Sequence, residues 1–270
     1  MEFFHLFLFN IYIDSVISSL RLSDYGCHLR GEYVGCIVYA DDILLLSASV
    51  TNLQKMLNIC CEQADHLDIQ FNPKKSCLFN VGKGYKDCIQ NLFIKDKEVV
   101  RLNRIRYLGV YFVTNKQLSI DISWICRKFY AAANAILYRT RYVSEMTRLC
   151  LFESFTLPLL TYGCEGINMS MADMQKLNVC WNNVYRKVFG MNLWESVKEL
   201  QLFCNRLDYV RIVHTRKLKF WFGLKLCDDK TLYWCSKWLC YNANFLKLCS
   251  EYKMDVGGNY CMNHDLLIMV

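Results

Sequence analysis

The sequence predicts an α+β fold, with strands and helices mixed in the first part of the chain and helices alone in the second. Short runs of β-branched and aromatic residues stand between residues 27 and 113. From about residue 117 onward, apolar residues recur at helical spacing almost to the end. Of the 270 residues 54% are hydrophobic, and only two prolines and 12 glycines occur. This composition favours two structural units with packed cores and excludes a disordered chain or a loop-rich β protein.

The first predicted element is a helix over residues 5–20. Turn-forming residues at 23–26 end it, and residues 27–40 are then expected to form two short strands around an Arg-Gly-Glu turn. The helix is predicted by the helical spacing of its apolar residues Leu6, Phe9, Ile13, Val16, Ile17 and Leu20.

A hairpin with two aspartates at its tip is predicted next. The apolar runs 36–40 and 43–46 are too short for helices and flank Asp41 and Asp42 directly. Two adjacent carboxylates between apolar strands need an explanation, because an unpaired buried carboxylate costs several kcal/mol or more.

A second helix should span residues 51–67, with Thr51 and Gln54 as a capping box and Pro73 as part of its stop signal. Strands are predicted at 77–81 and 107–113, with a polar connection between them. Two long helices follow, at 122–142 and 172–190, where apolar residues again recur at helical spacing.

Positive charge is concentrated in one region. The whole chain has a formal net charge of +7. Residues 101–148 contain nine Lys or Arg side chains but only Asp121 and Glu145 as acids. A polyanion such as nucleic acid would suit this region, although an ordinary solvated helix face would give the same pattern.

The cysteines and the N-terminus point to an intracellular protein. The 16 cysteines lie mostly within apolar runs, which favours reduced thiols over a secreted disulfide scaffold. The N-terminal apolar stretch has Glu2 in place of a basic region and no small-residue cleavage site, so it does not resemble a signal peptide. No membrane span is predicted, and the expected location is nuclear or cytoplasmic. A zinc site is not expected in the tail, because close CxxC pairs are absent from its candidate ligands Cys227, Cys235, Cys240, Cys249, Cys261 and His264.

The two aspartates suit a divalent metal site. Carboxylates on a tight hairpin tip can hold two metal ions about 3.5–4 Å apart, the arrangement used for phosphoryl transfer. Bound Mg²⁺ would offset the repulsion between them, and water or substrate phosphates would complete its oxygen ligands. Taken alone, two neighbouring aspartates are more often simple turn residues.

The flanking sequence favours the catalytic interpretation, because Y39-A-D-D42 resembles the catalytic motif of reverse transcriptases. The other resemblances follow the order of that family, and the last resembles the thumb of LINE-type (non-LTR) retrotransposon polymerases better than a group II intron maturase. They are FNIYIDSVISSL (9–20), HLDIQFNPKKSCLF (66–79), RYLGVYF (106–112) and LPLLTYGCEGINMSMADMQKLNVCWNNVYRKVFGM (157–191).

The resemblance implies a domain arrangement. Residues 1–115 would form a partial polymerase palm, an antiparallel sheet with packed helices that carries the YADD hairpin and the primer-grip region. Residues 116–200 would form a helical thumb, and residues 201–270 a helical extension with no assigned role.

The resemblance also implies roles for the catalytic residues. Asp41 would bridge both Mg²⁺ ions and Asp42 would be a supporting ligand. Lys75 would protonate or stabilise the leaving pyrophosphate, and the alternative is a solvated loop lysine.

Contacts to the primer and the RNA/DNA duplex are implied for a further set of residues. Gly109 could instead be a plain turn residue, and the tyrosines of the basic region could belong to the core. The set comprises Tyr39, Tyr107, Leu108, Gly109, Arg104, Arg106, Arg127, Lys128, Arg139 and Arg141.

Part of the family's machinery has no counterpart before Tyr39. Polymerases of this family use a further carboxylate from an earlier strand, and cationic fingers that grip the incoming dNTP. Neither Asp14 nor Asp24 lies at a position that matches this additional catalytic carboxylate. The chain is therefore expected to be the C-terminal part of an RNA-directed DNA polymerase, with weak or no metal binding and no activity of its own. The alternative is a non-catalytic nucleic-acid-binding remnant of a retroelement.

Overall fold

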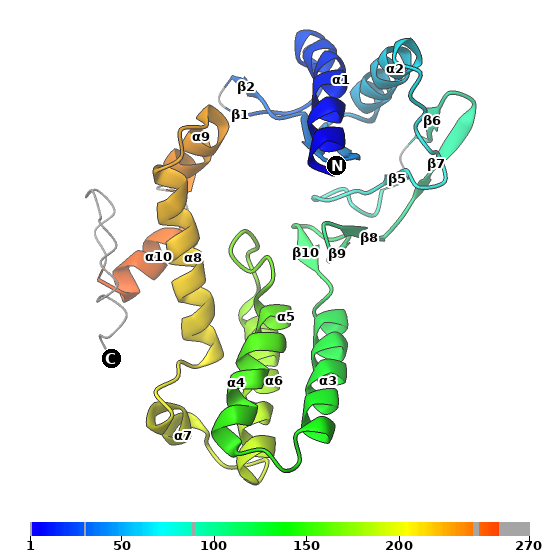
Figure 1. Cartoon of the computed structure of the whole chain (residues 1–270). Helices are drawn as coiled ribbons and strands as arrows, with labels where there is room; N and C mark the ends of the chain where they lie inside the picture. The colour runs from blue at the N-terminus through cyan, green and yellow to red at the C-terminus, as the bar shows by residue number, and fades with distance from the viewer. Residues whose placement is uncertain (1, 30, 88–89, 240–242, 254–270) are drawn as a thin grey trace. The chain divides into compact units, whose positions relative to one another are not determined.

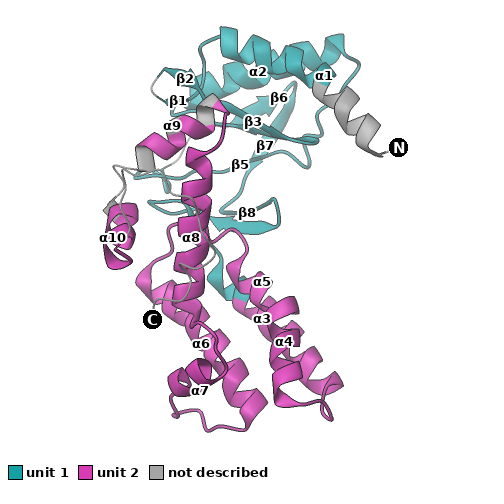
Figure 2. Ribbon diagram, turned by 60° about the vertical axis from the view of Figure 1, so that its left-hand side comes forward, with its two compact units in different colours: residues 1–125 teal, residues 126–270 magenta. Residues whose placement is uncertain are grey.

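The computed structural model describes residues 2–29, 31–87, 90–239 and 243–253. The chain forms two compact units, residues 1–125 and 126–270, drawn in teal and magenta in Figure 2. The first unit mixes helices with small, mainly antiparallel sheets, and the second is helical in its described residues. The α+β class with a helical C-terminal region is therefore confirmed. The functional division at 115/116 and 200/201 stays a prediction.

In its described residues, the first unit contains two long helices, ten short strands and the start of a third helix. Figure 1 labels these elements. Its elements are α1 Glu2–Leu22, β1 His28–Leu29, β2 Glu32–Tyr33, β3 Cys36–Tyr39, β4 Asp42–Leu45, α2 Val50–His66, β5 Cys77–Leu78, β6 Leu92–Ile94, β7 Lys97–Arg101, β8 Arg104–Tyr107, β9 Val110–Val113, β10 Ser119–Ile120 and α3 Ile122–Arg139, which continues into the second unit.

In its described residues, the second unit continues with helices alone (Figure 1). These are α4 Glu145–Phe155, α5 Leu157–Thr161, α6 Met171–Phe189, α7 Lys198–Phe203, α8 Tyr209–Lys225, α9 Lys230–Leu239 and α10 Ala243–Glu251. No helix in the described part of the chain is long and apolar enough to cross a membrane. The tail residues Cys240, Cys261 and His264 lie outside the described residues.

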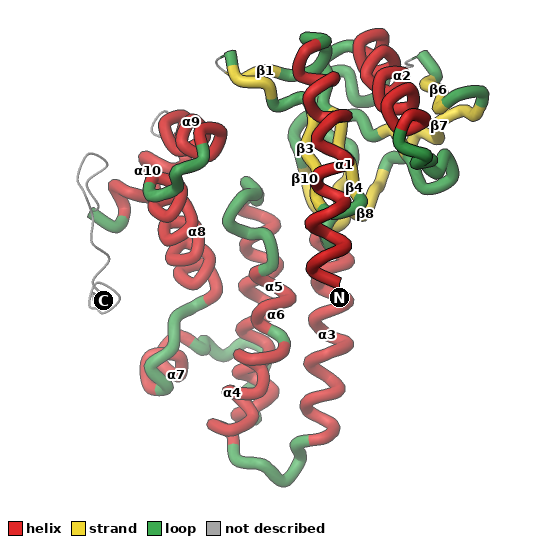
Figure 3. The backbone as a smooth tube through the Cα atoms, turned by 45° about the horizontal axis from the view of Figure 1, so that its top comes forward, coloured by secondary structure: helices red, strands yellow, loops and turns green. Residues whose placement is uncertain are grey.

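The core of the first unit lies between the β3–β4 hairpin and the two long helices. Ile13, Val16 and Leu20 of α1 pack with Met56 and Cys60 of α2, and apolar residues of the hairpin pack against this cluster. Figure 3 shows the hairpin strands beside these helices. The periodicity of the sequence thus produces the helices, and burial of their apolar stripes fixes the hairpin against them.

The predicted capping box of the second helix was wrong. Ser49, and not Thr51, caps α2: its side chain accepts a hydrogen bond from the Asn52 N–H. Gln54 bonds across to β6, since its amide accepts from the Phe93 N–H and donates to the Phe93 carbonyl, both at 2.8 Å. The helix itself spans Val50–His66, within one residue at each end of the predicted 51–67, and it ends before Pro73.

The strand predictions missed several turns. Residues 107–113 are not one strand but parts of β8 and β9, joined at Leu108 and Gly109. The polar connection before them contains the β6–β7 hairpin, and β5 pairs with β7 in parallel. The last strand, β10, lies in a stretch that was expected to be helical. These strands are two to five residues long, too short for periodicity to identify.

Candidate active site

The β3–β4 hairpin carries the two aspartates at its end, as predicted. Its register pairs Tyr39 with Asp42 and leaves Ala40 and Asp41 as the two-residue turn. Ala40 has a φ of 51°, and an alanine in this left-handed region costs about 1–2 kcal/mol. The turn is therefore strained locally, and the packed strands on either side must hold it in place.

Strand alternation divides the hairpin into a core face and an open face. Residues directly opposite each other in an antiparallel pair have side chains on the same face. Cys36, Val38, Ile43 and Leu45 face the core between α1 and α2. The open face therefore carries the remaining pairs, Tyr39 with Asp42 and Ile37 with Leu44.

The open face is accessible to a ligand. Tyr39 is 62% exposed and Ile37 is 46% exposed. Ile37 and Leu44 were not among the predicted site residues, although the alternation of the strand could have identified them.

Both aspartates are exposed, so neither carboxylate carries the cost of burial that the apolar flanks suggested. The flanking apolar residues are buried on one face of the hairpin, whereas Asp41 lies in the turn and Asp42 on the other face. Within the described residues, no hydrogen bond or ion pair joins either carboxylate to another side chain. The two carboxylates are thus available to bind a cation.

A second hairpin brings Tyr107 close to Asp42. Burial raises the pKa of the Tyr107 phenol, and the negative charge of Asp42 raises this pKa further. The hydroxyl of Tyr107 is buried and has no hydrogen-bond partner among the described residues. The structure therefore gathers Tyr39, Asp41, Asp42 and Tyr107 in one region of the first unit.

The turn of this second hairpin depends on Gly109. Leu108 has a φ of 46° and Gly109 a φ of 81°, and two positive φ angles are the mark of a type I′ hairpin turn. Gly109 is therefore a turn residue, which is the alternative that the sequence analysis left open. Tyr107 and Val110 close the turn as a directly opposed pair.

We expect Gly109→Ala to lower the free energy of unfolding by about 1–2 kcal/mol, because a Cβ is strained at positive φ. Urea titration would measure the change. Gly166→Ala is the matched control, since Gly166 lies in open space and has no positive φ, and it should stay within about 0.5 kcal/mol. Equal effects of the two substitutions would contradict the assigned turn.

Arg104 is engaged in the structure of the first unit. Its Nη2 lies 2.9 Å from Oδ2 of Asp121, and its guanidinium lies 4.0 Å from the ring centre of Tyr111. Asp121 in turn accepts a hydrogen bond from the Trp124 N–H at the start of α3. The Tyr111 ring packs edge-on against Trp124, with ring centres 4.7 Å apart. Arg104 thus ties the β8–β9 hairpin to α3, whereas Arg106 is exposed.

Lys75 lies in a tight loop organised by Asn72. The Asn72 side-chain oxygen accepts a hydrogen bond from the Lys74 N–H. The backbone carbonyl of Asn72 accepts hydrogen bonds from the N–H groups of Lys75 and Ser76. The Lys75 side chain is exposed, and no described hydrogen bond or ion pair joins it to Asp41 or Asp42. Its role in proton transfer stays a prediction.

The other predicted cations lie in the second unit. Arg127, Lys128 and Arg139 are exposed along α3. Arg141 follows the helix, with its guanidinium 4.7 Å from the ring centre of Tyr138, which is itself 69% exposed. An exposed arginine stacked on an exposed tyrosine is suited to phosphate and base contacts.

Asp41 and Asp42 are the candidate magnesium ligands among the described residues. Asp41 and Asp42 supply the hard oxygen ligands that Mg²⁺ prefers. No group of three or more His, Cys, Asp or Glu side chains placed to hold a metal ion occurs in the described part of the chain. The residues present therefore fit a shared site, which a further carboxylate and substrate phosphates would complete.

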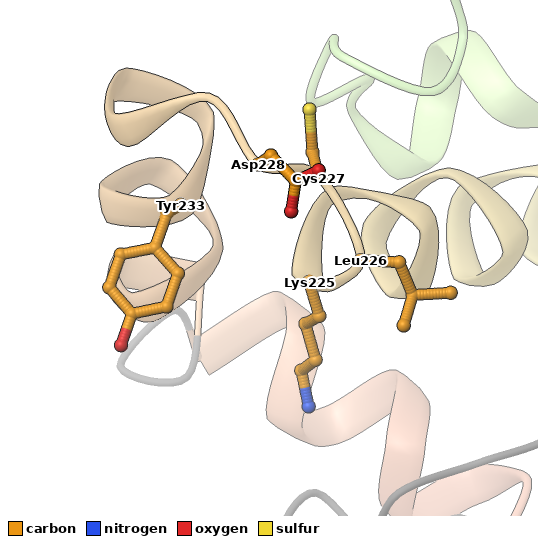
Figure 4. Close-up of a pocket in the computed structure, with 5 residues that line it drawn as sticks. All are labelled: Lys225, Leu226, Cys227, Asp228 and Tyr233. Carbon is orange, nitrogen blue, oxygen red and sulfur yellow. The ribbon is translucent and has the colours of Figure 1, made fainter.

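A pocket of about 430 Å³ lies in the second unit, next to the end of α8 and α9 (Figure 4). None of its lining residues is a predicted site residue: they are Lys225, Leu226, Cys227, Asp228 and Tyr233. It offers no metal ligands comparable with the hairpin, which remains the candidate site.

The first part of the chain is similar to a known protein family. Residues 6–112 match a family model described as "Reverse transcriptase (RNA-dependent DNA polymerase)". This range covers less than half of the chain and includes the whole β3–β4 hairpin, Lys75 and the β8–β9 turn. The chain is also similar to an uncharacterized transposon-derived protein of Caenorhabditis elegans, with 23% identity over 200 residues that cover 70% of this chain and 71% of the relative.

Proposed function

We propose that this chain is part of an RNA-directed DNA polymerase of a non-LTR retrotransposon, with the β3–β4 hairpin as its catalytic centre. The observation that carries the proposal is the placement of Asp41 and Asp42. They lie exposed at the strained end of a packed hairpin, beside Tyr39 and Tyr107, within the range that matches a reverse transcriptase family model.

In this proposal the carboxylates hold the cations that organise nucleotide transfer. Bound Mg²⁺ would polarise the phosphate and lower the pKa of the attacking 3′ hydroxyl. Asp41, in the turn, would contact both ions, and Asp42, fixed in β4, would contact one. Tyr39 shares the open face with Asp42 and would pack against the primer end or the incoming dNTP.

Further residues would bind and orient the nucleic acid. The turn at Leu108 and Gly109 would place a backbone segment against the primer strand. Lys75 would supply a proton or a positive charge to the leaving pyrophosphate. The exposed Arg127, Lys128, Arg139 and Arg141 would contact phosphates of the RNA/DNA duplex, and salt would weaken these contacts.

The isolated chain would bind nucleic acid without copying it. Asp41 and Asp42 would be two of the ligands of a two-metal site. No group of three or more possible metal ligands occurs in the described residues, and a site lacking a main ligand loses geometry and affinity. We propose that a longer product supplies a further carboxylate and cationic fingers. The second candidate function is that of a non-catalytic nucleic-acid-binding remnant, which the same exposed cations would support.

The transcript upstream of the Met1 codon is the first measurement to make. If the frame continues into a strand with another aspartate and into basic fingers, the longer product should extend a DNA primer on an RNA template with Mg²⁺. Residues 1–270 alone should show binding and no extension. A folded longer product that binds the duplex but incorporates no dNTP would contradict the polymerase proposal. A stop codon that interrupts the frame would leave the binding function.

A further inference from the structure

A lysine-bearing loop in the first unit lies outside the site described above. Residues 82–87 form the sequence Gly-Lys-Gly-Tyr-Lys-Asp between β5 and β6 (Figure 1). Two successive turns build it: the Tyr85 N–H donates to the Gly82 carbonyl at 3.1 Å, and the Asp87 N–H donates to the Gly84 carbonyl at 3.0 Å. The loop is therefore folded on itself.

Side chains from outside the loop hold it in one conformation. The guanidinium of Arg101, at the end of β7, donates to the Tyr85 carbonyl at 2.8 Å and to the Asp87 carbonyl at 2.7 Å. The Asn80 amide donates to the Gly84 carbonyl at 3.0 Å. These bonds use the carbonyl oxygens of Gly84, Tyr85 and Asp87, which removes three acceptors that would repel an anion.

The same fold brings a third lysine close to the loop. The Gly82 N–H donates to the Asn115 carbonyl at 3.0 Å, so Lys116 adjoins the loop that carries Lys83 and Lys86. All three lysines are exposed. None of them forms an ion pair with a described acidic side chain.

The remaining charges and donors also favour an anion. Asp87 is the acid within the loop, and its carboxylate lies against Gly84, where a Cβ would be 2.5 Å from Oδ2. The backbone N–H groups of Lys83, Gly84 and Lys86 donate to no acceptor among the described residues. Three ammonium groups and these N–H donors outweigh the single carboxylate.

We propose that Lys83, Lys86 and Lys116 form a phosphate-binding surface for the backbone of a nucleic acid. The three cations are exposed and spread over two loops, so they suit successive phosphates of a polynucleotide more than one small anion. Arg101 is a positioning residue, because its hydrogen bonds hold the loop. The surface goes beyond the proposed function, since its binding does not depend on Asp41 or Asp42.

The test measures binding of a labelled RNA/DNA duplex to the full chain by fluorescence anisotropy over a salt series. The triple variant K83Q/K86Q/K116Q should bind about tenfold more weakly or worse at low salt. The slope of log K against log salt should fall in magnitude by roughly 2–3, about 0.9 for each lost phosphate contact. The matched control is K97Q/K219Q/K247Q, which removes the same charge from exposed lysines elsewhere.

Two further arms keep the outcome decisive. R101K preserves the charge but loses the paired bonds to the two carbonyls, so it should weaken binding several-fold while far-ultraviolet circular dichroism stays unchanged. Equal losses in the two triple variants would overturn the proposal, because only net charge would then matter. Saturable binding of inorganic phosphate that the first triple variant abolishes, with duplex affinity unchanged, would also overturn it in favour of a small-anion site. The experiment measures binding and not primer extension, so its result is valid even if the chain has no polymerase activity.

Discussion

Replacing Asp41 by alanine in a longer product that extends primers should abolish nucleotide incorporation. A carboxylate that holds the metal ions contributes several kcal/mol of transition-state stabilisation, so the rate should fall about 10³-fold or more. Affinity for the RNA/DNA duplex should barely change, because Asp41 is an acid at a hairpin turn and not part of the basic surfaces. Single-turnover primer extension and duplex binding would be measured side by side.

The matched control for this substitution is Asp96→Ala. Asp96 occupies the same place in the β6–β7 hairpin that Asp41 occupies in β3–β4: each follows a residue with a φ near 50°, Lys95 and Ala40 respectively. The control should keep its activity, since this hairpin is not proposed to bind metal. Comparable losses in both variants would show that Asp41 acts through hairpin stability and would contradict its role as a metal ligand.

Replacing Leu20 by alanine should cause a large loss of stability, about 2–5 kcal/mol in the free energy of unfolding. Leu20 is fully buried and packs in the cluster that joins α1, α2 and the β3–β4 hairpin. The substitution removes buried methyl groups and leaves a cavity that the neighbours fill only in part. Urea unfolding followed by circular dichroism would measure the change.

Leu22→Ala is the control, on the same helix and with the same change of side chain. Leu22 is 86% exposed, so its truncation should change stability by no more than about 0.5 kcal/mol. Similar effects at the two positions would mean that α1 does not pack as the structure shows. Because the hairpin rests on this core, Leu20→Ala should also reduce any activity in proportion to the unfolded fraction.

The long helices and the YADD hairpin could be predicted from the sequence because their signals are local. Apolar side chains repeat along α1, α3 and α6 over five turns or so, and a buried stripe of that length specifies a helix. Two apolar runs around Asp41 and Asp42 likewise specify a hairpin with its polar residues at the tip.

The short turns were harder to predict. The β6–β7 hairpin turns at Lys95 and Asp96, which are not the Gly or Asn residues that mark such a turn in a sequence. At Leu108 and Gly109 the glycine indicated a possible turn, but the apolar residues around it were also consistent with one continuous strand. The capping residue of α2 was misplaced for a similar reason, since Ser49 and Thr51 both have side chains that can cap a helix.

The sequence by itself determined the candidate residues for chemistry: two carboxylates at the end of a hairpin, whose strand alternation fixes an open and a buried face. Only the tertiary structure decided which distant residues lie near these carboxylates and which are bound elsewhere in the fold. It brings Tyr107 to Asp42, commits Arg104 to Asp121 and Tyr111, and uses Arg101 to fix the loop of Lys83 and Lys86. The physical reason is that backbone periodicity depends on neighbours in the chain. Contacts between separate hairpins and loops depend instead on how the core packs and on where each polar group finds its partner.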